Sequence, residues 1–252
     1  MATVDMVPDD RAPLLRVEGV RKSFGGLVAI DDLSFDVKRG QILALMGPNG
    51  AGKTTTFHVV AGVHRPTAGR IVFDGRDITG ATPDRRCKAG LARTFQITQP
   101  FEELSVVENV MVGAVPHHAS MARLREDARR YVDMVGLSER ADVQAKGLST
   151  GQRKRLEMAR AMATRPKLLL LDEVTGGVDQ KSIPGLLDLV RRMRDDGLTL
   201  VIIEHNMKVI NELADVAIFM NRGALLAQGT PQDVARHPDV VELYLGAAHV
   251  HE

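Results

Sequence analysis

The stretch GPNGAGKT, residues 47–54, decides the fold of this chain. It matches the phosphate-loop pattern G-x-x-x-x-G-K-[ST], and it lies between the apolar run 42–46 and a segment with helical character. Glycines let the backbone curl so that successive N–H groups point at phosphate oxygens, and the next helix adds its positive dipole end. The sequence therefore predicts a strand, a phosphate-binding turn and a helix in that order.

The last side chains of this loop have separate predicted tasks. We expect Lys53 to reach the β- and γ-phosphates of a bound nucleotide and the Thr54 hydroxyl to bind Mg²⁺. A glycine-rich turn without a ligand is the alternative, and the position between strand and helix argues against it. The residues predicted to bind nucleotide in and beside this loop are Gly47, Pro48, Asn49, Gly50, Ala51, Gly52, Lys53, Thr54 and Thr55.

A second apolar run, residues 168–171, is followed directly by two carboxylates, Asp172 and Glu173. Ligands of open α/β sheets bind at the carboxyl ends of the strands, where these two side chains are expected to lie. Asp172 is suited to hold Mg²⁺ through its water shell, and Glu173 to orient or deprotonate an attacking water. Two acidic residues after a strand by themselves more often belong to a surface turn. Because a phosphate loop precedes them in this chain, we expect a nucleotide site instead.

The periodicity of apolar residues predicts an α/β fold. Residues 42–46, 168–171 and 200–203 are apolar on both faces, as parallel strands covered by helices on each side are. Residues 14–20, 34–37 and 70–73 alternate apolar and polar side chains, as half-buried strands do. Residues 216–220 and 224–228 flank a three-residue connection that ends in Gly223, which predicts a hairpin. We therefore expect a parallel central sheet with an antiparallel β subdomain.

The middle of the chain has a different periodicity, because apolar residues between positions 101 and 145 recur at helical spacing. We expect residues 97–147 to form a helical subdomain inserted into an α/β core made of residues 14–96 and 148–246. No repeat or flexible linker separates these parts, so residues 1–252 are predicted to form one domain.

Charge and composition exclude several classes of partner. The chain has 33 basic and 32 acidic residues, so its net charge of +1 gives no field that would attract nucleic acid or anionic lipid. With no Trp and two Tyr it also has few rings on which bases could stack, and we expect no nucleic-acid partner. Its apolar runs are far shorter than the roughly 20 residues that span a bilayer. The single Cys87 fits a reducing cytosol, and residues 1–11 lack the features of a secretory signal.

The residues 148–152, LSTGQ, resemble the signature motif of ATP-binding cassette (ABC) ATPases, which in that family also lies shortly before the acidic strand end. The resemblance extends from residue 14 to residue 246. It implies that Phe24 stacks on adenine, that Gln96 senses metal and γ-phosphate, and that His205 grips the γ-phosphate. It also implies that Asp179 lies in a loop that crosses a dimer interface.

This resemblance implies a P-loop NTPase fold, a RecA-like ABC ATPase core with an antiparallel β subdomain and an inserted α-helical subdomain. It implies catalytic roles for Glu173, His205 and Gln96, and Mg²⁺ ligation by Thr54, Gln96 and Asp172. In the family a second ATPase subunit completes the site, so Ser149 and the backbone of Gly151 would donate to the γ-phosphate across a homodimer or heterodimer. ATP then joins the two subunits, and hydrolysis makes closure and opening a two-state switch.

Three positions depart from the commonest family pattern. Thr150 replaces a glycine of the signature, Val174 replaces the proline that follows the catalytic glutamate, and Gln180 replaces a proline after Asp179. The phosphate-facing positions of the signature are retained. The two lost prolines are expected to loosen the backbone around the catalytic carboxylate, because each loses a fixed φ. These departures bear on the rate of turnover rather than on ATP binding.

Details outside the nucleotide site resemble the ATPase subunits of bacterial branched-chain amino acid uptake transporters, a group whose members also serve urea, amides and aromatic acids. The resemblance is carried by residues 24–31, 93–96, 203–207, 229–231, 237–240 and 244–246. It implies two transmembrane permease subunits, a periplasmic or extracellular solute-binding protein, and a location on the cytoplasmic face of the inner membrane. Residues 97–113 are then expected to grip a membrane subunit, with Phe101, Leu104 and Val106 as anchors or, equally, as core residues.

Other functions make different demands on the sequence. Residues 53–57 and 177–179 also resemble the lipopolysaccharide-export ATPase, and Val174 is consistent with a regulatory module of little hydrolysis. An ABC ATPase of DNA repair needs a long coiled-coil insertion between its motif halves, and the segment between Lys53 and Asp172 is too short and lacks heptads. A small-molecule kinase needs an arginine-bearing lid instead of a signature motif.

Overall fold

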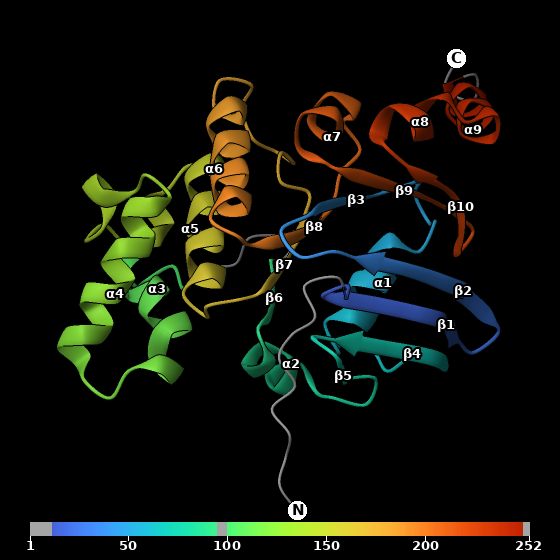
Figure 1. The fold of residues 1–252 in the computed structure, drawn as a ribbon. Coiled ribbons are helices and arrows are strands. Elements are labelled where there is room, and N and C mark those ends of the chain that lie inside the picture. The colour runs from blue at the N-terminus through green and yellow to red at the C-terminus, as the bar shows by residue number, and fades with distance from the viewer. Residues whose placement is uncertain (1–11, 95–99, 249–252) are drawn as a thin grey trace, which may run out of the picture.

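A computed structural model describes residues 12–94 and 100–248 of the chain, and within these residues the strands form two sheets (Figure 1). The first sheet has the order β2-β1-β4-β5 and is antiparallel; its strands are β1 (Leu15–Phe24), β2 (Leu27–Val37), β4 (Ala68–Phe73) and β5 (Arg76–Asp77). The second has the order β10-β9-β3-β8-β7-β6; its strands are β3 (Ile42–Met46), β6 (Leu91–Arg93), β7 (Leu168–Asp172), β8 (Thr199–Ile203), β9 (Val216–Asn221) and β10 (Ala224–Gly229).

The second sheet is parallel except at one edge, where β10 pairs antiparallel with β9 through the predicted hairpin. Every residue of β3, β7 and β8 is buried, because both faces of these strands are covered. The register places Asp172 opposite Ile203, so the carboxyl ends of β7 and β8 lie side by side. The predicted α/β fold class with a parallel central sheet and an antiparallel subdomain is confirmed.

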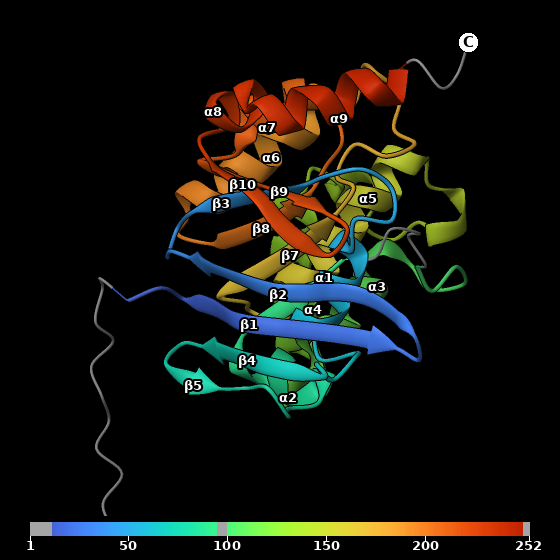
Figure 2. The same ribbon diagram turned by 90° about the vertical axis from the view of Figure 1, so that its right-hand side faces the viewer.

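Helices cover the parallel sheet on both faces. Figure 2 shows α6, α7, α8 and α9 above it and the antiparallel sheet below it. Helix α1 lies between the two sheets, and its Phe57 shares one buried cluster with Leu15 of β1 and Leu43 of β3. The helices are α1 (Lys53–Val60), α2 (Pro83–Ala89), α3 (Val106–Ala114), α4 (Met121–Met134), α5 (Thr150–Met162), α6 (Ile183–Asp195), α7 (Met207–Leu213), α8 (Pro231–Arg236) and α9 (Pro238–Ala248).

Helices α3 and α4 pack on α5 at the side of the molecule far from β1 and β2 (Figure 1). Helix α3 begins with a capping box, in which the side chains of Ser105 and Glu108 each accept from the other's backbone N–H. Val106 follows this cap and is 0% exposed within the main hydrophobic core. Of the two alternatives for Val106, the structure supports core packing, because the side chain packs α3 into the core and is not exposed to a partner.

The far end of α1 is held by a buried arginine. Arg86 of α2 donates from Nη1 to the carbonyl oxygens of Val59 and Val60, at 2.8 and 2.6 Å. These carbonyls belong to the last turn of the helix, where no intrahelical donor is available. Burial lowers the pKa of Arg86 to about 10. The last turn of the helix that starts at the phosphate loop is thus held by a side chain of α2.

Candidate active site

The phosphate loop connects β3 to α1 and is shaped by its glycines. Gly47 has φ 139° and Gly52, the N-cap of α1, has φ 100°. A Cβ atom at Gly47 would lie 2.1 Å from the carbonyl oxygen of Met220, and one at Gly52 would lie 2.4 Å from that of Ala29. Only glycine fits these two positions, because the loop is pressed against β9 on one side and β2 on the other.

Lys53 is buried at the start of α1 and folds back over the loop. Its Nζ donates to the carbonyl oxygens of Gly47 and Pro48, at 2.7 and 2.9 Å. Burial lowers the pKa of Lys53, and the nearby carboxyl groups of Glu173 and Asp172 act in the opposite direction. The ammonium group therefore lies inside the loop, within the electrostatic field of the two strand-end acids.

Asp172 ends β7 and is only 3% exposed. Its backbone N–H donates to Thr94 Oγ1 at 3.2 Å, but within the described residues its Oδ2 is buried without a hydrogen-bond partner. Burial, and after it the neighbouring Glu173, raises the pKa of Asp172. An unsatisfied buried carboxyl oxygen is costly unless a cation or donor meets it.

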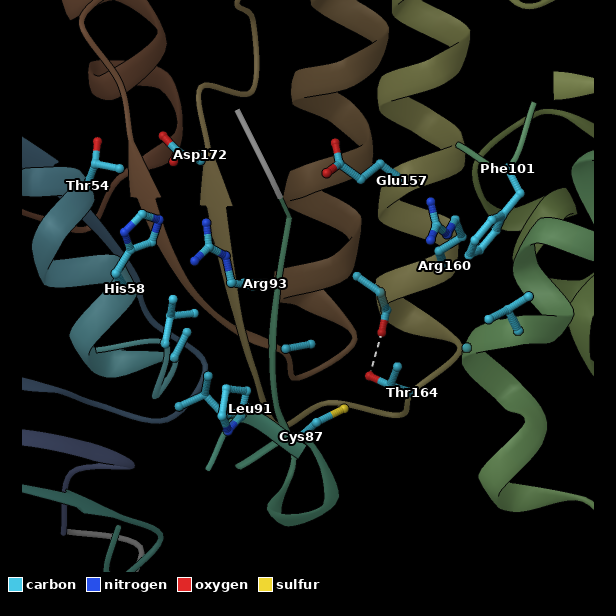
Figure 3. Close-up of a pocket in the computed structure, with 17 residues that line it drawn as sticks. Thr54, His58, Cys87, Leu91, Arg93, Phe101, Glu157, Arg160, Thr164 and Asp172 are labelled. Atoms are coloured by element: carbon cyan, nitrogen blue, oxygen red, sulfur yellow. Dashed lines mark hydrogen bonds between the residues drawn. The ribbon is translucent and has the colours of Figure 1, made fainter. Parts of the chain in front are cut away.

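Thr54 and Asp172 line the same cavity of about 810 Å³ (Figure 3). The hydroxyl comes from the first turn of α1 and the carboxyl group from the end of β7. Oxygen atoms of this kind are the ligands that Mg²⁺ takes from protein, with water and phosphate supplying the others. The residues present therefore fit a bound Mg²⁺.

Glu173 has a strained backbone next to the last residue of β7. Its φ of 51° is in the left-handed region, which side chains other than glycine seldom adopt. The segment is held from two directions, because Glu173 N–H donates to Ile203 O at 3.0 Å and Lys154 Nζ donates to Glu173 O at 2.9 Å. The carboxyl Oε1 lies 3.5 Å from His205 Nε2. Two of the residues predicted to be catalytic are thus neighbours.

The signature motif lies at the exposed start of α5. Ser149 is the N-cap; its Oγ accepts from Gln152 N–H at 3.3 Å, and Gln152 Oε1 accepts from Ser149 N–H at 3.0 Å. Gly151 is buried, and a Cβ there would contact Ser182 at 3.4 Å. Ser182 in turn donates to exposed Asp179 from Oγ at 2.7 Å and N–H at 3.1 Å, and the side-chain bond most strongly lowers the pKa of Asp179.

Phe24 ends β1 and is 43% exposed. Lys22 Nζ lies 4.7 Å from the centroid of its ring, and the His64 ring meets it edge-on with centroids 5.2 Å apart. The ring is thus held in place by two cationic or polar neighbours while nearly half of its residue surface stays open to solvent.

The structure brings Lys53, Asp172, Glu173 and His205 together at the carboxyl ends of β3, β7 and β8. Gln96 lies outside the described residues. Sequence reasoning missed two buried residues of this region, Lys154 and Glu204, both of which bond to the segment after β7. The sequence does contain a signal for Glu204, because this acidic residue directly follows the apolar run 200–203, as Asp172 follows the apolar run 168–171.

The chain matches the family model described as ABC transporter over residues 30–176, and the model described as branched-chain amino acid ATP-binding cassette transporter over residues 224–250. It belongs to the ABC transporter family, as an ATP-binding and ATP-hydrolysing subunit. It is 37% identical to the high-affinity branched-chain amino acid transport ATP-binding protein BraF of Pseudomonas aeruginosa, over 94% of this chain and 99% of that protein. It is 34% identical to the LivG protein of the same description from Escherichia coli, with the same coverage.

Solved structures agree with this assignment. A nucleotide-free ATP-binding cassette from an ABC transporter superposes with a TM-score of 0.85 at 31% identity, covering 92% of this chain and 98% of that one. The ADP conformation of the cassette MJ1267 also gives 0.85, at 32% identity, covering 93% and 99%.

Proposed function

We propose that the site hydrolyses ATP with Glu173 as the general base for the attacking water and His205 as the group that holds the γ-phosphate. Lys53 and the N–H groups of the loop bind the phosphates, and exposed Phe24 stacks on the adenine. Thr54, Asp172 and Gln96 hold Mg²⁺, which when bound neutralises charge on the β- and γ-phosphate oxygens. The 3.5 Å approach of His205 to Glu173 supports this assignment, because both side chains reach one point beside the phosphate loop.

A second ATPase subunit completes this site in our proposal. Ser149 and the backbone of Gly151 lie at the N-terminus of α5, where N–H groups and the helix dipole favour an anion. Ser149 is exposed, and because its Oγ acts as an acceptor in the capping box, the hydroxyl hydrogen can be donated to a γ-phosphate. The partner is a copy of this chain or a related subunit, and Asp179 lies on the same exposed side of the signature.

We propose that the transported solute is a branched-chain amino acid or a related small solute. The observation that carries this is the 37% identity to a branched-chain amino acid transport protein over nearly the full length of both chains. The relatives favour uptake over lipopolysaccharide export. Among residues 12–94 and 100–248, none of the helices has both the length and the apolar character needed to cross a bilayer. We propose that two transmembrane permease subunits carry the solute and that this chain binds them at the cytoplasmic face of the inner membrane. A periplasmic or extracellular solute-binding protein would deliver the solute.

The cavity beside the active site is the proposed permease-docking surface. Phe101 lines it and is 46% exposed, and Arg160 of α5 lies with Cζ 4.8 Å above the Phe101 ring. Leu104 is exposed nearby in sequence. We place this surface on a helical subdomain of residues 97–147, with the nucleotide-binding core formed by residues 14–96 and 148–246. A partner segment in the outer part of the cavity beside Phe101 would contact residues of both parts.

Uptake measurements test the proposed solute. Deletion of the gene from its own cells is expected to abolish high-affinity uptake of labelled leucine, isoleucine or valine, because the permease lacks its ATPase. The wild-type gene restores uptake and the Lys53→Ala variant does not. Unchanged uptake of all three amino acids, with loss of urea, amide or aromatic acid uptake, would redirect the assignment to that solute.

Replacing Phe101 with Asp tests the docking surface. We expect uptake in the complemented cells to fall by about tenfold or more, because a charge replaces an exposed ring in the proposed interface. ATP hydrolysis by the isolated subunit should stay within about twofold, since Phe101 has no place in the hydrolytic machinery. Val241→Asp, an exposed apolar residue on α9, is the matched control. Normal uptake by the Phe101 variant would place the permease elsewhere.

A further inference from the structure

We infer that Glu204 is a positioning residue that ties the segment after β7 to the end of β8 and so fixes the spacing between Glu173 and His205. The inference rests on the proposed roles of those two residues. Glu204 itself does not need to touch ATP, because it acts through the backbone on either side of the site.

Both oxygens of the Glu204 side chain are used. Oε1 accepts from Thr175 N–H at 2.9 Å and from Thr175 Oγ1–H at 3.0 Å. Oε2 accepts from the backbone N–H of His205 at 3.3 Å. One side chain therefore joins a residue two positions after Glu173 to the residue that carries the candidate γ-phosphate contact.

The burial of Glu204 makes these bonds necessary. The residue directly follows β8 and is 4% exposed, and a buried carboxyl group is costly unless its oxygens accept hydrogen bonds. An apolar side chain would fill the same position without that cost. The three bonds thus account for a polar residue at a place where packing alone would favour Val or Leu.

Val174, which stands where the family usually has proline, explains why the segment after Glu173 needs the bonds of Glu204. A proline after Glu173 would fix one backbone dihedral, and Val174 leaves it free. Glu173 nevertheless holds a φ of 51°, a conformation that persists only where the surroundings over-determine it. Lys154 and Ile203 hold Glu173 itself, and Glu204 holds Thr175 two residues on. In this chain a side-chain clamp performs the restraint that proline supplies elsewhere.

The substitutions Glu204→Gln and Thr175→Val test the clamp. Glutamine keeps the size but puts an NH₂ group where one acceptor was, and valine removes only the hydroxyl donor. We expect kcat for ATP hydrolysis to fall about tenfold in Glu204→Gln and about threefold in Thr175→Val, with KM for ATP within about twofold of wild type. The double variant should lose less than the product of the two, because both changes break the same contact.

The matched control is the capping box of α8, where Thr230 N–H and Oγ1–H donate to Asp233. Thr230→Val removes the hydroxyl donor and Asp233→Asn replaces one acceptor with NH₂, which are the same chemical changes far from the site, and both should leave kcat unchanged. A normal kcat in Glu204→Gln, a change confined to KM, or a loss that disappears when activity is measured further below the melting temperature would overturn the inference. If Glu173→Gln also leaves turnover unchanged, the site assignment itself has failed; if only the Glu204 variant is active, the clamp alone is refuted.

Discussion

Glu173→Gln is expected to lower ATP hydrolysis by about 100-fold or more while ATP still binds. The amide keeps the shape of the side chain but cannot take a proton from the attacking water. The phosphate loop and Lys53 are untouched, so the nucleotide contacts remain. In the proposed dimer both subunits hold the γ-phosphate and hydrolysis removes it, so the variant should accumulate as an ATP-bound dimer.

Phosphate release and size-exclusion chromatography with ATP measure the two parts of this expectation. Glu242→Gln, an exposed glutamate on α9, is the control and should behave as wild type. Hydrolysis at the wild-type rate would remove Glu173 from the role of general base. A variant that hydrolyses ATP slowly yet elutes as a monomer at saturating ATP would contradict the proposal that two subunits share the site. The proposed role of Glu173 as general base would still stand.

The same experiment separates a hydrolytic subunit from a regulatory module. If Val174 had made the site inactive, the wild type would already be slow and the substitution would change little. The structure favours the hydrolytic role, because Glu173 is held by Ile203 and Lys154 despite the missing proline. The quantity that separates the two roles is the ratio of the hydrolysis rates of the wild type and Glu173→Gln, not the absolute rate of the wild type.

Local chemistry explains which features could be predicted from the sequence. The phosphate loop is recognised from the consecutive residues 47–54. The strands β3, β7 and β8 are apolar apart from Asp172 and Thr199, because both of their faces are covered. Asp172 and Glu173 follow directly from the end of such a run. The hairpin of β9 and β10 also depends on residues a few positions apart.

Contacts between distant segments could not be predicted in the same way. The Glu204 bonds to Thr175 join positions 29 residues apart, and Lys154 reaches Glu173 from another helix. The distinction between Val106 and Phe101 also depends on packing, since both are apolar and only the fold buries one of them. An apolar pattern gives the face of a helix, but the neighbour that covers that face is a tertiary property.

Lys53→Ala is expected to weaken binding of MgATP by about 100-fold or more. Charge-assisted hydrogen bonds contribute about 1.5 to 3 kcal/mol each, and Nζ is proposed to make such bonds to both the β- and γ-phosphates. In the structure Nζ donates to the carbonyl oxygens of Gly47 and Pro48, so the ammonium group already lies in the loop. Binding of ADP should weaken by only about tenfold, because ADP has the β-phosphate but no γ-phosphate, and the variant therefore loses one proposed contact instead of two.

AMP provides the internal comparison, because it lacks both phosphates that Lys53 is proposed to contact. Its weak affinity should be the same in the variant and the wild type, whereas general damage to the loop would reduce all three affinities together. Lys38→Ala, an exposed lysine in the turn before β3, controls for the lost charge. Titration calorimetry gives each constant, and equal factors for ATP, ADP and AMP would show that Lys53 supports the shape of the loop without binding phosphate. The graded losses follow from the position of one ammonium group.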